Sequence, residues 1–252
     1  MTTYEEEFKR LENTIHRLMK FALLGKSISL RGQNNFVKAG PNIIVGNHIG
    51  SFKDIAVLLS IVPRLIVFTA NKQIFDKHEF NVLMRKHLKR HLKKIGLFLD
   101  LLIKPFMVPV INFITGNIAK IGTVPVELDT KKRMAIERCQ DTVEQGRALI
   151  LLQGRGRIVP EDKNPYVHTF RKGVAIISYN LYKEKKISVP ITPLAMFGTH
   201  WPFPVPKRIR VNVGEPMFIK DFWAHSFDET VENFRLALEE RVKGLLKELL
   251  YN

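Results

Sequence analysis

Cysteine is almost absent from this chain of 252 residues, and Cys139 is the only one that it contains. A single thiol excludes a disulfide within the chain and any zinc site built from several thiolates. The low cysteine content therefore favours a reducing compartment. Three scattered histidines, His168, His200 and His225, have no acidic or thiol residue at ligand spacing, so we expect no metal site.

Acidic side chains are also scarce, because 24 Asp and Glu stand against 40 Lys and Arg and leave a formal net charge of +16. This surplus must lie mainly on the surface, since an unpaired charge is very costly to bury. We therefore expect an anionic partner. Nucleic acid, an anionic bilayer and a phosphorylated small substrate all fit, and charge alone does not choose among them.

The sequence lacks an unbroken apolar run of the length that crosses a bilayer. Its longest apolar tract, residues 95–118, is interrupted by charged residues, asparagine and proline, which predicts peripheral contact with a membrane. The first seven residues, Met-Thr-Thr-Tyr-Glu-Glu-Glu, are acidic where a secretory signal carries positive charge. We therefore expect the protein on the cytoplasmic side of a membrane.

With 45% hydrophobic residues, the chain can bury the core of one α/β domain. Apolar residues near its start recur at spacings of three and four, which predicts an amphipathic helix that ends near Gly25. This stripe consists of Tyr4, Phe8, Leu11, Ile15, Leu18 and Ala22. It suits either docking against the domain or anchoring in a membrane interface. We divide the chain into an N-terminal amphipathic helical segment, 1–26, and an α/β domain, 27–252.

Short apolar segments alternate with helical patterns along the rest of the chain. Predicted strands cover residues 27–32, 42–46, 65–70, 123–127, 148–152, 188–195 and 209–214. Predicted helices cover residues 55–62, 132–145 and 229–250, and Asp228 is expected to cap the last of them. This alternation predicts an α/β fold, with a mixed, mainly parallel sheet flanked by helices.

The segment 85–94 is strongly basic, with six lysines and arginines and two histidines in ten residues. It immediately precedes the apolar tract, 95–118. A basic segment beside an apolar one suits the bilayer interface, where cations meet lipid phosphates. A solvated helix face followed by core residues explains the same pattern equally well.

Residues 45–54, Val-Gly-Asn-His-Ile-Gly-Ser-Phe-Lys-Asp, place a histidine at the end of a buried strand and a carboxylate at the start of the next helix. Strand ends in open α/β sheets lie at the rim of a crevice where substrates bind. There a neutral His48 can take a proton from an attacking alcohol, while Asp54 fixes the ring tautomer and stabilises the imidazolium. Helix capping is the alternative role for Asp54.

The Asn47-His48 pair followed by Asp54 resembles the hallmark of the glycerolipid acyltransferases typified by lysophosphatidic acid acyltransferase. Three later blocks follow in the order that this family has. They are Gly146-Arg-Ala-Leu-Ile-Leu-Leu-Gln-Gly-Arg, similar to a block that ends in Pro-Glu-Gly-Thr-Arg; Phe170-Arg-Lys-Gly, similar to Phe-Lys-x-Gly; and Val189-Pro-Ile-Thr-Pro, similar to Val-Pro-Ile-x-Pro. The resemblance spans roughly residues 27–250, and it suggests a divergent member.

The chain departs from the family pattern at three places. Five residues separate His48 from Asp54, where four are usual, and we expect Gly50 to accommodate the extra residue because glycine tolerates unusual turn geometry. Gln153 stands at the position of the family's glutamate, and Arg-Gly-Arg at 155–157 replaces Thr-Arg. The family's acceptor-binding block usually ends in arginine, whereas the corresponding block here, Val124-Pro-Val-Glu-Leu-Asp, has none. Three cations, Lys131, Lys132 and Arg133, follow it. The identity of the acceptor therefore stays open.

The resemblance implies an O-acyltransferase of phospholipid biosynthesis with a His48/Asp54 dyad and no cofactor. The arginines at 155 and 157 have the fork geometry that suits a phosphate. The expected substrate-binding residues are Asn47, Gln153, Gly154, Arg155, Arg157, Arg171 and Lys172. A flexible basic loop at 154–157 and solvated side chains at Arg171 and Lys172 are the alternatives.

The resemblance also implies the partners of such an enzyme. We expect acyl-CoA or acyl carrier protein as donor, a lysolipid as acceptor, and an anionic membrane surface that is contacted as a peripheral or monotopic protein. Nucleic acid is not expected, because the sequence shows neither zinc-finger spacing nor the aromatic pattern of an RNA-recognition sheet. The rival hypothesis is an inactive basic module that binds membranes or nucleic acid through residues 85–94.

Overall fold

The computed structural model describes residues 3–91, 96–126, 132–202 and 205–251, without the side chains of residues 87–106 and 132. Contacts divide the chain into two compact units. The smaller unit holds residues 1–10 and 68–135, and the larger holds residues 11–67 and 136–252. The separate N-terminal segment, 1–26, that the sequence suggested stays a prediction.

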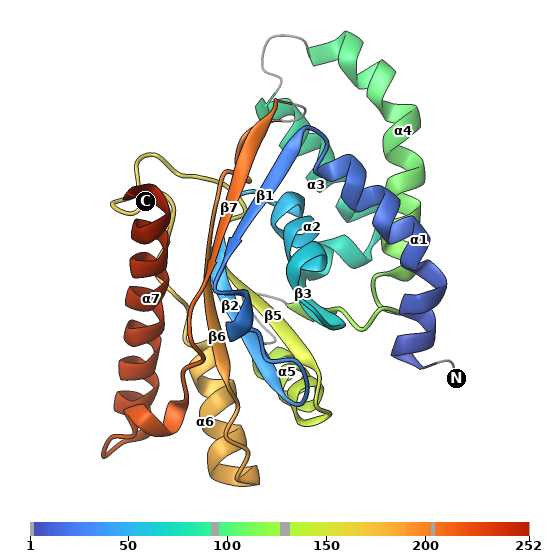
Figure 1. Cartoon of the computed structure of the whole chain (residues 1–252). Coiled ribbons are helices and arrows are strands. Elements are labelled where there is room, and N and C mark those ends of the chain that lie inside the picture. Colours follow the sequence, from blue (N-terminus) through green and yellow to red (C-terminus); the bar gives the residue numbers. More distant parts are fainter. Residues whose placement is uncertain (1–2, 92–95, 127–131, 203–204, 252) are drawn as a thin grey trace. The chain divides into compact units, whose positions relative to one another are not determined.

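Five strands form the sheet of the larger unit, in the order β1-β7-β6-β2-β5 (Figure 1). Their bounds are β1 Lys26–Arg31, β2 Asn42–His48, β5 Ala148–Gly154, β6 Ile191–Phe197 and β7 Lys207–Val213. Strand β2 pairs in parallel with β5 and β6, and β1 pairs in parallel with β7. Among the described pairings only β6 and β7 are antiparallel. The predicted α/β fold with a mixed, mainly parallel sheet is confirmed.

The antiparallel pair decides which chain ends meet at each edge of this sheet. Because β2, β5 and β6 run in the same direction, their carboxyl ends lie at one edge. Strand β7 runs opposite to β6, and β1 is parallel to β7, so their amino ends reach that same edge. His48, Gly154 and the residues after Phe197 therefore share an edge with Lys26 and Lys207. We call it the catalytic edge, after the catalytic role that the sequence analysis predicts for His48.

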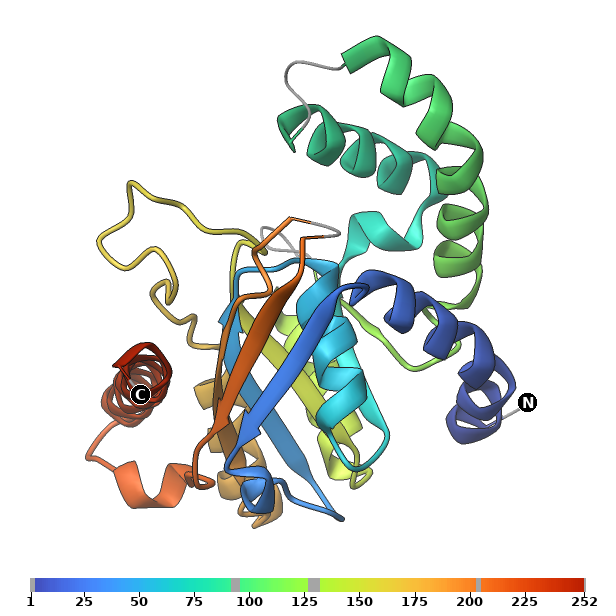
Figure 2. The ribbon, with the colours of Figure 1, turned by 45° about the horizontal axis from the view of Figure 1, so that its top comes forward.

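Helices cover both faces of the sheet. Helix α2 (Phe52–Ile61) lies on one face, and α6 (Gly173–Lys185) and α7 (Phe227–Tyr251) lie together on the other (Figures 1 and 2). Helix α5 (Lys132–Glu144) precedes β5. Strand β2 is buried along almost its whole length, which explains its run of apolar residues.

The N-terminal helix is α1, Tyr4–Ala22. Every residue of its predicted apolar stripe is buried or half-buried. In the larger unit the end of this helix packs on α2 in a small apolar cluster. The cluster consists of Ile15, Met19, Ala22, Leu23, Ala56 and Leu59. This end of the stripe is therefore a docking face, which is one of the two roles that the sequence left open.

The smaller unit contains most of the remaining elements. Strand β3 (Ile66–Asn71) begins in the larger unit and ends in the smaller one, where it pairs in parallel with β4 (Val124–Val126). A 3-10 helix, Lys72–Phe75, and helix α3, Lys77–His91, follow β3, and helix α4, Gly96–Asn117, precedes β4. The backbone of α4 stays helical through both of its prolines, which the sequence analysis treated as interruptions.

Within the described ranges, no helix is both long and apolar enough to cross a bilayer. Two of the sequence predictions fall largely outside those ranges. The basic segment, 85–94, has described side chains only at Arg85 and Lys86. The end of the acceptor-binding block, residues 127–129, lies outside the described residues. So do Lys131 and the side chain of Lys132.

The cap of α7 is Ser226, and the prediction that Asp228 caps this helix is wrong. Ser226 Oγ accepts a hydrogen bond from the Glu229 N–H at 3.2 Å, and the Ser226 carbonyl accepts one from Thr230. Serine followed three residues later by glutamate is a capping-box pattern, so the signal was present in the sequence. Asp228 lies inside the first turn, where its negative charge interacts favourably with the helix dipole.

Replacing Phe234 by alanine tests the core beneath α7. Phe234 is fully buried and its ring lies 5.2 Å from that of Phe222, centroid to centroid. The free energy of unfolding should fall by about 3–5 kcal/mol, because the lost ring leaves a cavity. Leu236 lies on the same helix but is 44% exposed. In urea denaturation Leu236→Ala should cost less than about 0.5 kcal/mol, and equal losses would contradict this packing.

Candidate active site

His48 and Asp54 meet at the catalytic edge. His48 is the last residue of β2, and Asp54 lies in the first turn of α2. His48 Nδ1 and Asp54 Oδ2 are 2.8 Å apart. The histidine side chain is 26% exposed, whereas the carboxylate is fully buried. The imidazole can therefore be reached from solvent, while its partner is protected from water.

Asp54 holds the turn as well as the histidine. Its Oδ2 also accepts hydrogen bonds from the backbone N–H groups of Ile49 and Gly50, at 2.9 and 2.8 Å. A carboxylate that accepts these bonds also accepts a hydrogen bond from Nδ1–H of His48, and this tautomer leaves Nε2 as the ring nitrogen that can accept a proton. These contacts give Asp54 a role beyond helix capping.

The extra residue between His48 and Asp54 is not accommodated as the sequence suggested. The positive φ of the turn falls on Ser51, with φ 55° and ψ −127°, and not on Gly50. Glycine is needed at position 50 because a Cβ there would lie 2.3 Å from Thr199 Cβ and 2.7 Å from Asp54 Oδ1. The requirement is therefore close packing of the turn against the end of β6, and the strained backbone lies one residue later.

Thr199 borders the dyad and was not found from the sequence. It is fully buried, and its Oγ1 and Asp54 Oδ1 both lie within 2.7 Å of the Cβ position at Gly50. In the part of the chain that the structure describes, neither oxygen has a hydrogen-bond partner. The hydroxyl thus stands beside the oxygen of Asp54 that the turn does not use.

The loop after β5 closes over the exposed nitrogen of His48. Gly154 pairs with His48 in the sheet, and the Gly156 N–H donates to the His48 carbonyl at 3.1 Å. Gly156 has φ 69°, and a Cβ there would lie 3.1 Å from His48 Nε2. A side chain at position 156 would therefore crowd His48 Nε2, and glycine leaves this space open. Arg155 is exposed and Arg157 is half-buried in the same loop.

A second His–Asp pair lies next to this loop. His168 Nδ1 is 2.7 Å from Asp162 Oδ2, and His168 Cδ2 is 3.2 Å from the Cβ position at Gly154. This pair was not predicted from the sequence, in which His168 was rejected only as a metal ligand. Among the described residues, no group of three or more His, Cys, Asp or Glu could hold a metal.

Asn47 bonds only to backbone groups in the described contacts. Its amide exchanges two hydrogen bonds with Met196 of β6, at 2.8 and 2.9 Å, and donates a third to the Tyr166 carbonyl at 3.1 Å. The side chain is fully buried. It holds β2 and β6 together just before the turn that joins His48 to α2, whereas the resemblance implied a substrate contact.

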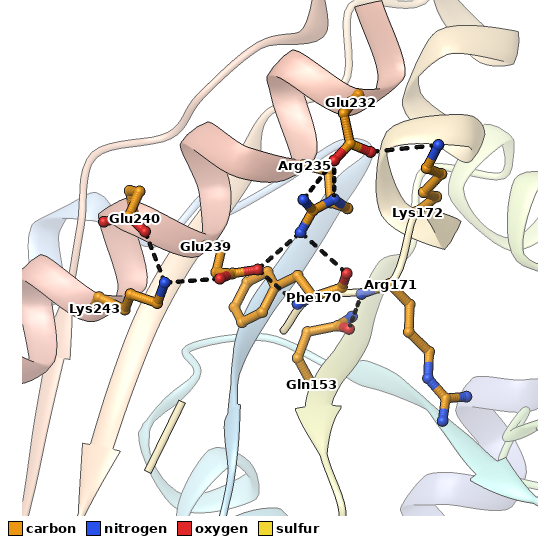
Figure 3. A network of polar contacts seen from close by, with 9 residues as sticks. All are labelled: Gln153, Phe170, Arg171, Lys172, Glu232, Arg235, Glu239, Glu240 and Lys243. Atoms are coloured by element: carbon orange, nitrogen blue, oxygen red, sulfur yellow. Dashed lines mark hydrogen bonds and ion pairs between the residues drawn. The ribbon is translucent and has the colours of Figure 1, made fainter. Parts of the chain in front are cut away.

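A polar network from α7 supports the block that contains Arg171 and Lys172 (Figure 3). Glu239 Oε2 accepts from the Phe170 N–H at 2.9 Å, and Arg235 Nη1 donates to Glu239 at 2.8 Å and to the Phe170 carbonyl at 3.4 Å. Gln153 Oε1 then accepts from the Arg171 N–H at 3.0 Å. Three successive backbone groups are thus held by side chains.

The side chains of this block point in different directions. The Arg171 guanidinium extends away from the network in Figure 3, and the residue is exposed. Lys172 Nζ lies 3.4 Å from Oε2 of Glu232 on α7, and this ion pair joins Lys172 to the network. The structure therefore brings Gln153 and Arg171 together, and it turns Lys172 toward α7.

Comparisons with known proteins bear on the fold. No family model and no curated protein matches this chain. The crystal structure of the 1-acyl-sn-glycerophosphate (LPA) acyltransferase PlsC from Thermotoga maritima is similar to it, with a TM-score of 0.57 and 22% sequence identity. The similarity covers 97% of this chain and 83% of PlsC. The chain has the fold of PlsC.

Replacing Gly50 by alanine should disrupt the turn, because its Cβ would overlap Thr199 and the Asp54 carboxylate. We expect a loss of stability of about 1–3 kcal/mol and displacement of Asp54 from His48. Gly116→Ala is the matched control, since nothing lies within 4 Å of its Cβ position. Thermal unfolding and a crystal structure of the variant measure both effects. An unchanged turn would show that a Cβ at position 50 has more room than these distances indicate.

The Glu239 carboxylate should give a pH-dependent contribution to stability. Burial alone would raise the pKa of Glu239, but Lys243, the Phe170 N–H and Arg235 outweigh it and hold this pKa below its ordinary value. The stabilisation is then complete above the ordinary carboxyl pKa and is lost as the pH falls through the lowered one.

Glu239→Gln should therefore cost about 2 kcal/mol at pH 7, and the difference from wild type should shrink below about pH 4. Urea unfolding at both pH values measures it. Glu240→Gln is the control, because Glu240 also contacts Lys243 but its side chain is 68% exposed. A pH-independent loss in Glu239→Gln would rule out the charged contacts as its cause.

Proposed function

We propose that this chain is an O-acyltransferase, a divergent member of the glycerolipid acyltransferases, that moves a fatty acyl group from a thioester to a lipid hydroxyl. The observation that carries the proposal is the contact between His48 Nδ1 and Asp54 Oδ2 at the carboxyl end of the central strand. The fold shared with PlsC over nearly the whole chain supports it. The acceptor is a lysophospholipid or a related glycerolipid.

The chemistry requires only the dyad and the two substrates. His48 Nε2 takes the proton of the acceptor hydroxyl as its oxygen attacks the thioester carbonyl. Asp54 stabilises the imidazolium that forms. The tetrahedral intermediate then collapses, the C–S bond breaks, and the imidazolium returns its proton to the departing thiolate. An ester and a free thiol result, with no covalent enzyme intermediate.

The oxyanion of the intermediate needs hydrogen-bond donors near His48. The backbone N–H groups of Ile49, Gly50 and Gly156 already donate within the protein. They are therefore unsuited to this role. The remaining groups of the loop 154–157 are the proposed donors, because this loop lies against His48.

The acceptor phosphate is assigned to the arginines on the β5 side of the dyad. Arg155 and Arg157 lie in the loop beside His48, and Arg171 is tied to the end of β5 through Gln153. Arginine offers the planar fork that matches phosphate oxygens. Lys172 contributes to the same positive field, although its ammonium lies near Glu232.

The acyl donor is acyl-CoA or acyl carrier protein, and the enzyme works at the cytoplasmic surface of an anionic membrane as a peripheral or monotopic protein. The net charge of +16 supports attraction to such a surface. The rival function is an inactive basic module. Binding to anionic liposomes and to DNA at equal salt separates the two, since the acyltransferase should prefer lipid.

His48→Ala tests the proposed chemistry. The purified chain is incubated with labelled acyl thioesters and a panel of lysolipids, and the products are identified by mass spectrometry. Loss of the base should lower kcat by about 10²- to 10⁴-fold with an unchanged fold. His225→Ala is the control, because His225 is exposed and lies outside the site. Undiminished transfer by His48→Ala would refute the mechanism.

A further inference from the structure

Three lysines gather on the other side of the dyad, and the proposed chemistry does not use them. Lys26 begins β1 and Lys207 begins β7, and the two are direct neighbours in the parallel pair. Both reach the catalytic edge because β7 is antiparallel to β6. Lys53 precedes Asp54 in the first turn of α2. The three come from three separate elements of the larger unit.

The loop after β6 ties these lysines together. Lys26 Nζ donates to the carbonyls of Pro202 and Val205, at 3.1 and 2.5 Å, and Lys53 Nζ donates to the carbonyl of Trp201. Lys207 Nζ lies 5.0 Å from the centroid of the Trp201 ring. Each of the three ammonium groups thus lies close to Trp201, Pro202 or Val205.

The charges of the three lysines repel one another, and no ion pair within the described residues balances them. In the described chain, none of the three lysines forms an ion pair with an acidic side chain. Burial and the charge of Lys207 lower the pKa of Lys26, and burial and the charge of Lys26 lower the pKa of Lys53. Asp54 partly offsets this effect at Lys53. An anion at this place would relieve the repulsion.

The position of the lysines indicates which anion binds to them. Along the catalytic edge His48 lies at the end of β2, with the arginines on its β5 side and Lys26 and Lys207 beyond β6 on the opposite side. An acyl transfer brings two substrates to one base from different directions. Since the arginines are assigned to the acceptor, the lysines face the direction left for the donor.

We infer that Lys26 and Lys207, with the buried charge of Lys53 behind them, bind a phosphate of the acyl donor's carrier arm. The inference rests on the proposed function, and it adds the placement of the two substrates on opposite sides of His48. Coenzyme A and the phosphopantetheine of a carrier protein share this phosphate chemistry. Lysine suits it as a compact charge with several donors.

The test compares thioesters that differ in phosphate content. The double variant Lys26→Met/Lys207→Met should raise KM for acyl-CoA about tenfold while kcat changes less than twofold, because two ammonium contacts are lost. Acyl-pantetheine, which has no phosphate, should show no change in KM, and neither should the lysolipid acceptor. Acyl phosphopantetheine should be affected as acyl-CoA is. Lysine-to-arginine replacements should restore most of the affinity.

A direct measurement of coenzyme A binding tests this site independently of the proposed reaction. Calorimetry on the full chain should show about tenfold weaker binding in the double variant, and wild-type binding should weaken as salt is raised. Lys38→Met is the matched control, because Lys38 is exposed and precedes the amino end of β2, at the opposite edge. Lys207→Met alone, which removes no hydrogen bond to the loop, should weaken binding about threefold.

Several outcomes would overturn the site. Unchanged coenzyme A binding in the double variant would do so even if wild type transfers acyl groups. An equal loss with acyl-pantetheine would show that the lysines only hold the loop, and a raised KM for the acceptor would assign them to the lipid headgroup. Lysine-dependent binding of coenzyme A by a chain that transfers no acyl group would instead refute the proposed function.

Discussion

One carboxylate oxygen holds the catalytic edge together. Asp54 Oδ2 is buried and accepts three hydrogen bonds, one from the His48 ring and two from the backbone of Ile49 and Gly50. The same charge therefore orients the imidazole and closes the turn that leads into α2. Because no water competes for a fully buried oxygen, these bonds are stronger than they would be on the surface. The extra residue between His48 and Asp54 is compatible with this arrangement because Ser51 adopts the unusual backbone angles.

A second constraint is the direction of β7. In a wholly parallel sheet the amino ends of β1 and β7 would lie at the edge opposite to His48. The antiparallel pairing with β6 reverses both strands and brings Lys26 and Lys207 to the catalytic edge. The dyad then lies between arginines on one side and lysines on the other. A reaction between two phosphate-bearing substrates suits such a division of positive charge.

Helix α7 reaches this edge through polar contacts. Glu239 and Arg235 hold both backbone groups of Phe170, and Gln153 holds the next N–H (Figure 3). Gln153 stands where the acyltransferases that the sequence resembles have glutamate, and here its neutral amide suits a backbone donor. The exposed Arg171 thus extends from a backbone that three side chains fix. Such support lowers the conformational entropy that a ligand must remove on binding.

The sequence by itself determined the strands, the fold class and the contact between His48 and Asp54, because these depend on residues close together in the chain. Alternating and continuous apolar runs mark the strands, and His48 and Asp54 are six positions apart. Helix α6 was not predicted, because it is buried on more than one side and its sequence shows no single apolar stripe. Only the tertiary structure decided that Thr199 packs on Gly50, and that Glu239 reaches Phe170 across 69 residues. The tertiary structure also placed Lys26 beside Lys207 on neighbouring strands. Contacts of this kind depend on strand order and direction, which no local pattern encodes.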